Sequence, residues 1–157
     1  MYREILEARR ISLGEDHPDT LWTHNGLGGL LVNRGKLKEA EELLEKSATG
    51  LAKSLGRSHA DTLWVFHNLA IVYENTGKLE EAEKLHKQAF AGYNAELGME
   101  HPDTLWLLND LAACYSRSGK LVEAEKTFRQ AYEGKLARLG FFHPETLYTA
   151  NCLAGAI

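Results

Sequence analysis

Apolar residues recur along the chain at spacings of three and four, the pattern of amphipathic helices. Between Pro18 and about Asn33, Leu21, Leu27 and Leu31 fall on one helical stripe. A second stripe predicts a helix from about Leu37 to Ser54. Further along, the same two stripes return as Leu63, Phe66, Leu69, Ala70 and Tyr73, and as Ala82, His86, Ala89, Phe90 and Tyr93. The pattern therefore predicts pairs of helices.

The helix pairs belong to an internal repeat. His17-Pro18-Asp19-Thr20-Leu21-Trp22 has counterparts that begin at His59, His101 and His143, each 42 residues after the last. Residues 56–97 and 98–139 share 21 of 42 positions. The sequence thus divides into 1–13 (second helix of a partial repeat), the repeats 14–55, 56–97 and 98–139, and 140–157 (first helix of a partial repeat).

Short connections place consecutive helices side by side and antiparallel. Gly35, Gly77 and Gly119 end each first helix, because glycine readily takes a left-handed conformation. One helix pair cannot bury its stripe alone, so stacking of pairs predicts a single all-α, right-handed solenoid of eight helices and about 3.7 repeats. Small residues at matching places predict close helix approach: Gly28, Ala70, Ala112 and Ala154 in first helices, and Ala40, Ala82 and Ala124 in second helices.

Composition narrows the class of function. A net charge of −4 argues against a partner recognised through its phosphates. No apolar run has the roughly 20 residues that a membrane span needs. Cys114 and Cys152 stand in no metal-ligand spacing and are typical of reduced thiols, so we expect a cytoplasmic protein.

Catalytic and metal-binding patterns find no support. The recurrent histidines would lie roughly 10 Å apart in a solenoid, too far to share a zinc ion, and we interpret them as residues of turns or helix starts. Gly26-Leu27-Gly28-Gly29 lies inside a predicted helix and lacks the lysine of a phosphate loop. The Glu-Ala-Glu triplets, such as Glu81-Ala82-Glu83, are typical of solvated helix faces. We expect no enzyme, no cofactor and no metal.

The order Leu69-Ala70-x-x-Tyr73, Gly77, Ala82 and Ala89 resembles the tetratricopeptide repeat. The 42-residue length and the string His-Pro-Asp-Thr-Leu … Asn-x-Leu-Ala … Gly-Lys-Leu-x-Glu-Ala-Glu are similar to the repeats of kinesin light chains. Comparable arrays occur in NLR-type signalling ATPases. The resemblance implies a non-enzymatic array that binds peptides or proteins in a concave groove lined by its first helices.

By this analogy, the groove is lined by the stripe beside the core stripe of each first helix, which in the first two full repeats also contains Gly29, Val32, Ile71 and Glu74. An amide can pair with both the C=O and the N–H of an extended peptide, and the aromatic rings offer apolar area. With few charges present, we expect a weakly charged ligand, although Arg117 could contact one acidic group. The predicted site residues are Trp22, Asn25, Asn33, Trp64, His67, Asn75, Trp106, Asn109, Arg117, Tyr148 and Asn151.

Two alternatives remain open at this point. The recurrent amides could instead bond the neighbouring repeat and hold the stack in register, and the tryptophans could cover the turn before each helix. At the level of function, the alternative to peptide binding is a structural or regulatory array, one that self-associates end to end through apolar helices at 1–13 and 144–157. It could also be the sensor or scaffold region of a larger signalling ATPase.

Overall fold

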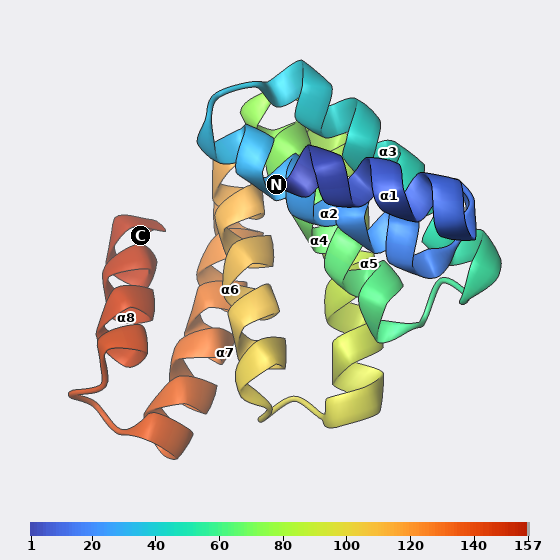
Figure 1. The fold of residues 1–157 in the computed structure, drawn as a ribbon. Coiled ribbons are helices and arrows are strands. Elements are labelled where there is room, and N and C mark those ends of the chain that lie inside the picture. The colour runs from blue at the N-terminus through green and yellow to red at the C-terminus, as the bar shows by residue number, and fades with distance from the viewer. Residues whose placement is uncertain (157) are drawn as a thin grey trace. The chain divides into compact units, whose positions relative to one another are not determined.

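The computed structural model describes residues 1–156, which form helices joined by short loops (Figure 1). The first helices of the repeats start at residues 18, 60, 102 and 144, and thus keep the 42-residue interval. No strand occurs in this range. The helices are α1 (Tyr2–Leu13), α2 (Pro18–Asn33), α3 (Leu37–Ser54), α4 (Ala60–Asn75), α5 (Leu79–Leu97), α6 (Pro102–Arg117), α7 (Leu121–Leu139) and α8 (Pro144–Ala156).

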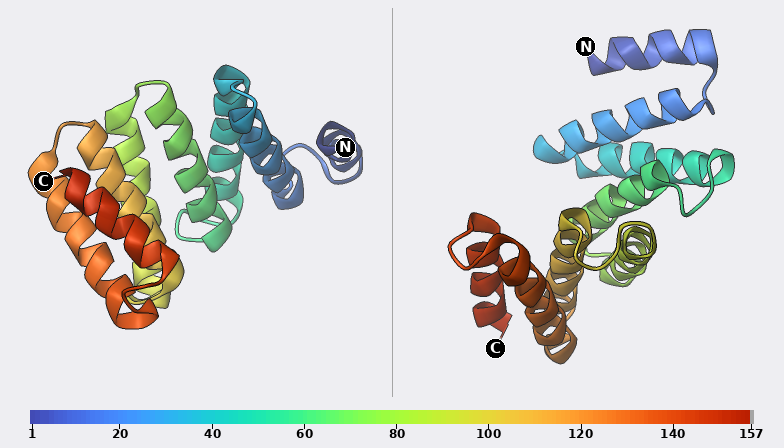
Figure 2. Two further views of the ribbon diagram at one scale, coloured as in Figure 1. Left: turned by 90° about the vertical axis from the view of Figure 1, so that its left-hand side faces the viewer. Right: turned by 90° about the horizontal axis from the view of Figure 1, so that it is seen from below.

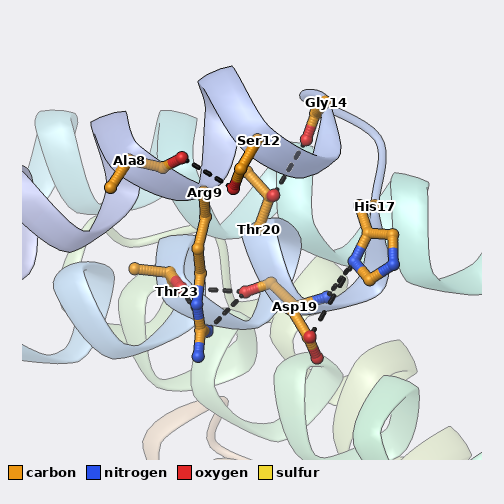
Figure 3. Close-up of polar contacts among 8 residues, drawn as sticks. All are labelled: Ala8, Arg9, Ser12, Gly14, His17, Asp19, Thr20 and Thr23. Carbon is orange, nitrogen blue, oxygen red and sulfur yellow. Dashed lines mark hydrogen bonds and ion pairs between the residues drawn. The ribbon is translucent and has the colours of Figure 1, made fainter.

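Each first helix begins at a histidine whose ring accepts a backbone hydrogen bond. His17 Nδ1 accepts from the N–H of Asp19 at 3.2 Å (Figure 3). His59, His101 and His143 repeat this contact at 3.2–3.3 Å. The free N–H groups of a first helical turn need such an acceptor. The predicted role of these histidines at helix starts is confirmed.

First helices end where the backbone turns left-handed. At the end of α6, Gly119 has φ 74°, which glycine adopts at little cost. Its N–H donates to the carbonyl of Ser116 at 3.1 Å, and the N–H of Lys120 donates to the carbonyl of Tyr115 at 2.9 Å. These two bonds form a Schellman motif. The glycine that recurs in every repeat therefore separates the two helices of a pair.

The chain forms two compact units, divided between Lys78 and Leu79. In the first unit, α2 packs against α1 and α3, and α3 packs against α4 (Figure 2). Leu21, Leu44, Leu51 and Val65 are each no more than 1% exposed and form part of its core. The Ser47 hydroxyl in α3 donates to the Leu21 carbonyl in α2 at 2.7 Å, which links the pair inside that core.

In the second unit, α6 packs against α5 and α7, and α7 packs against α8. Ala112, Ala124, Phe128 and Ala156 form a cluster that joins α6, α7 and α8. Within residues 1–156, no helix combines the length and the apolar character needed to cross a membrane.

Small residues lie where helices approach closely. Ala40, Ala70, Ala82, Ala112 and Ala124 are fully buried, as predicted. Ala154 is exposed, but no second helix follows α8 in this sequence, so the prediction is not tested at that position. A Cβ on Gly28 would lie 2.7 Å from Leu44 Cγ.

Two close approaches were not foreseen from the sequence. A Cβ on Gly50 would lie 2.5 Å from a methyl group of Leu21, and one on Gly134 would lie 2.5 Å from Leu105. These glycines of the second helices make room for the leucine that precedes the tryptophan of each first helix.

The glutamates of the Glu-Ala-Glu triplets are not merely a solvated face, which corrects the expectation above. Glu83 is only 8% exposed and accepts from Lys87 and Lys120 at 2.6 Å each. Glu41 accepts in the same way from Lys78 in the first unit. In these two Gly-Lys-Leu turns the lysine therefore bonds back to the preceding second helix, whereas Lys36 of the first such turn bonds Glu39 of the helix that follows it. Although burial opposes ionisation, the two ammonium groups hold the pKa of Glu83 below its usual value.

Candidate peptide-binding surface

The predicted stripe of the first helices lines a pocket in the first unit. The pocket has a volume of about 250 Å³ and lies between α2 and α4. Gly29, Val32 and Asn33 come from α2, Asn68 and Ile71 come from α4, and Leu44 of α3 completes the lining. Apolar walls with two amides, and with no charged side chain, suit an aliphatic group attached to a peptide backbone.

The pocket depends on the missing side chain of Gly29. A Cβ built on this glycine would meet no atom within 4 Å. The equivalent residue one repeat later is Ile71, which forms a wall of the same pocket. The space is therefore open because the first repeat carries glycine where the second carries isoleucine.

The aromatic residues of the predicted site present substantial surface to solvent. Trp22 is 39% exposed, Trp106 is 37% exposed and Tyr148 is 61% exposed. Trp64 is half-buried, with its ring centroid 5.7 Å from that of His67. The pKa of Tyr148 is raised by the neighbouring side chain of Cys152 and, to a smaller extent, by the Asp110 carboxylate.

The other predicted site residues divide into an exposed group and a buried group. Asn33, Asn75, Asn151 and Arg117 are exposed. Asn25, His67 and Asn109 are buried, at 5%, 0% and 2% exposure. The Oδ1 atom of Asn25 accepts from Asn68 Nδ2 at 2.9 Å. The bond between Asn25 and Asn68 is of the kind expected if the recurrent amides join neighbouring repeats.

The same arrangement recurs in the second unit. Asn109 Oδ1 of α6 accepts from the Thr149 hydroxyl of α8 at 3.0 Å. In both units the amide of one first helix bonds the next first helix, so it fixes the spacing on which the exposed stripe depends.

Sequence reasoning missed Asn68 and Leu44 as lining residues. Asn68 follows the recurrent ladder position, and its equivalents are Gly26, Asp110 and Cys152, so no repeated chemistry marks it. Leu44 belongs to the core stripe of α3 and is fully buried as a residue, although one side of it borders the pocket.

Metal-binding geometry is not found in residues 1–156: no group of three or more His, Cys, Asp or Glu side chains there could hold an ion. Cys114 is buried and Cys152 is half-buried, and neither forms a disulfide.

Comparison with known proteins agrees with this architecture. The sequence profile of the tetratricopeptide repeat matches residues 1–53, 24–95 and 61–137. No curated protein sequence matches the chain. Two crystal structures of a Podosopora anserina protein, assigned as a kinesin light chain with nearly identical TPR-like repeats, superpose with TM-scores of 0.89 and 0.87 at 30% identity. They align with 99% of this chain and with 73% and 74% of theirs.

A further match is structural only. BtubC (BKLC) from P. vanneervenii superposes with a TM-score of 0.87 at 22% identity, over 99% of this chain and 62% of that one. The chain belongs to the tetratricopeptide repeat family and is an all-α solenoid of that type. Its repeats are of the kinesin-light-chain type. Repeats of this family are generally protein–protein interaction modules rather than enzymes.

Proposed function

We propose that this chain binds an extended, weakly charged peptide segment of a partner protein along its first helices, without catalysis. The pocket between α2 and α4 carries the proposal, because four of its lining residues, Gly29, Val32, Asn33 and Ile71, lie on the stripe predicted from the sequence. An aliphatic side chain of the ligand would fill the pocket, and the Asn33 amide would pair with the ligand backbone.

An aromatic residue near the start of α2 supports a second point of contact. Trp22 lies in the same helix as Gly29, two turns from the pocket, and is 39% exposed. Burial of such a ring contributes about 25 cal/mol per Å². Since the pocket lining holds no charged residue, a neutral segment fits it better than an acidic one. The two cysteines without a disulfide suit a reducing compartment such as the cytoplasm.

Gly29→Leu provides a selective test. A random-peptide phage library is panned against the wild-type chain, and the affinities of enriched peptides are then measured by fluorescence anisotropy. Because a Cβ at Gly29 meets nothing within 4 Å, the variant should keep its fold while its side chain fills the pocket. We expect affinity to fall roughly tenfold, the cost of losing one buried aliphatic contact.

The control is Lys126→Leu, which adds the same side chain on an exposed position of α7. Trp22→Ala tests the second contact. Unchanged affinity in Gly29→Leu, with a melting temperature no lower than that of the wild type, would contradict pocket binding. Failure to enrich any peptide, together with concentration-dependent light scattering, would favour self-association instead.

A further inference from the structure

Each second helix meets the first helix that follows it at a joint: α1/α2, α3/α4, α5/α6 and α7/α8. The joint α1/α2 contains a half-buried cation. Arg9 Nη1 of α1 donates to the Thr23 hydroxyl of α2 at 2.8 Å and to the Asp19 carbonyl at 2.9 Å (Figure 3). Thr23 is only 4% exposed, so one end of this contact is buried.

The joint α7/α8 has the same design. Lys135 of α7 is 2% exposed, and its Nζ donates to the Thr149 hydroxyl of α8 at 3.2 Å. Glu145 Oε2 lies 3.7 Å from the same ammonium group. Thr149 is fully buried and passes the chain of bonds on to Asn109 of α6. Here the cation is buried along its whole length.

The two joints use equivalent positions of the repeat. Steps of 42 residues lead from Arg9 to Leu51, Tyr93 and Lys135, and from Thr23 to Val65, Leu107 and Thr149. A hydroxyl thus stands opposite each cation, whereas the two middle joints carry apolar or aromatic residues on both sides. Val65 and Leu107 are no more than 1% exposed.

We propose that these pairs keep the helices of the two outer joints from packing on those of the two middle joints when the chain folds. Because the repeats are alike, a second helix could also pack on the wrong first helix, a typical failure of repeat proteins. Arg9 packed on α4 would meet Val65 in place of a hydroxyl. Every first helix has a backbone carbonyl at the position of Asp19, so the threonine hydroxyl is the group that discriminates.

The two pairs affect the fidelity of folding more than the stability of the folded chain. A buried ion in a protein interior is weak evidence for stability, and an apolar pair of similar volume often replaces it without loss. A donor left without its acceptor changes an equilibrium by about tenfold or more. Pairing the correct helices therefore gains little over an apolar joint, whereas pairing the wrong ones is strongly penalised.

The experiment compares equilibrium stability with the fidelity of refolding. Arg9→Leu/Thr23→Val converts the first joint to the apolar type. We expect each single substitution to destabilise the chain, and the double variant to regain nearly the wild-type urea midpoint. After dilution from urea, however, the share recovered as native monomer on size exclusion should fall, because the mis-stacked fraction rises by up to about tenfold.

A second variant installs the cation in a middle joint. In Leu51→Arg/Val65→Thr the new arginine can bond the new threonine hydroxyl, but the joint α3/α4 then resembles the two outer joints. The share of this variant recovered after refolding should therefore fall as well. Leu51→Met/Val65→Ile keeps an apolar joint and is the control. Recovery equal to that of the wild type in both double variants, or a double Arg9→Leu/Thr23→Val variant as unstable as the single ones, would overturn the proposal.

Discussion

Two neighbouring glycines of α2 allow packing and backbone effects to be separated. Gly28 and Gly29 lie in the same helix, and glycine in a helix interior costs about 1 kcal/mol relative to alanine. Gly29→Ala adds a methyl group that meets no atom within 4 Å. It should therefore stabilise the fold by about 1 kcal/mol, which for a chain of this length raises the melting temperature by about 2–4 °C.

Gly28→Ala gains the same helix stabilisation of about 1 kcal/mol, but its methyl group would lie in a crowded part of the core. Its Cβ would lie 2.7 Å from Leu44 Cγ and 3.0 Å from a Leu44 methyl group, and Leu44 is fully buried. Overpacking of this kind costs about 1–3 kcal/mol, so the net effect ranges from neutral to a loss of about 2 kcal/mol. Urea unfolding followed by tryptophan fluorescence and circular dichroism measures both variants. The reasoning is refuted if Gly28→Ala proves as stable as Gly29→Ala, or if Gly29→Ala falls below the wild type.

Three further predictions concern caps and charges. His101→Ala removes the acceptor at the start of α6 and should cost about 1 kcal/mol in urea unfolding, whereas His101→Asn, with an amide oxygen in reach, should cost much less. Glu83→Gln removes the charge that pairs with two partly exposed lysines and should cost about 1 kcal/mol at low salt. Glu125→Gln loses one exposed ion pair with Arg129 and should cost at most a few tenths of a kcal/mol. Equal losses in the two variants would argue against the inter-repeat role of Glu83. Burial lowers the pKa of His24 from 6.5, so at this position the unfolded chain binds a proton more readily than the folded chain, and stability falls as the pH drops below about 6.5. His24→Phe, which copies Phe66 of the next repeat, should flatten that part of the pH profile of the melting temperature. An unchanged profile would contradict this prediction.

Helix positions could be predicted because each boundary is encoded locally and encoded repeatedly. The bounds Pro18–Asn33 and Leu37–Ser54 are those that the sequence predicts. A histidine acceptor, an acid in the first turn and a terminal glycine mark the limits, and these signals recur every 42 residues.

The side-chain environment of the candidate site was harder to predict. Asn25 and Asn33 belong to one stripe in the sequence, yet Asn25 is buried and Asn33 is exposed. The stripe spans a wide sector of the helix, and a modest rotation decides whether a residue faces the neighbouring helix or solvent. A helical pattern gives the sector but not the position of the neighbour.

The repeat pattern also could not predict contacts between non-equivalent positions. The bond between Asn68 and Asn25 joins two such positions, as does the bond between Lys120 and Glu83. The close approach at Gly134 could be predicted only if the direction of the Leu105 side chain were known. Each of these depends on three-dimensional placement that comparing one repeat with the next cannot supply.

The lysines of two Gly-Lys-Leu turns, Lys78 and Lys120, give the chain a salt-sensitive form of cooperativity. Lys78 holds Glu41, and Lys120 holds Glu83, so adjacent hairpins are linked by charges whose outer ends are open to solvent. In repeat proteins, such links between neighbours decide whether the array melts as a whole. Concentrated salt screens exposed charges but spares the apolar contacts inside each hairpin. Ionic strength thus acts on the sharpness of unfolding before it acts on the hairpins themselves.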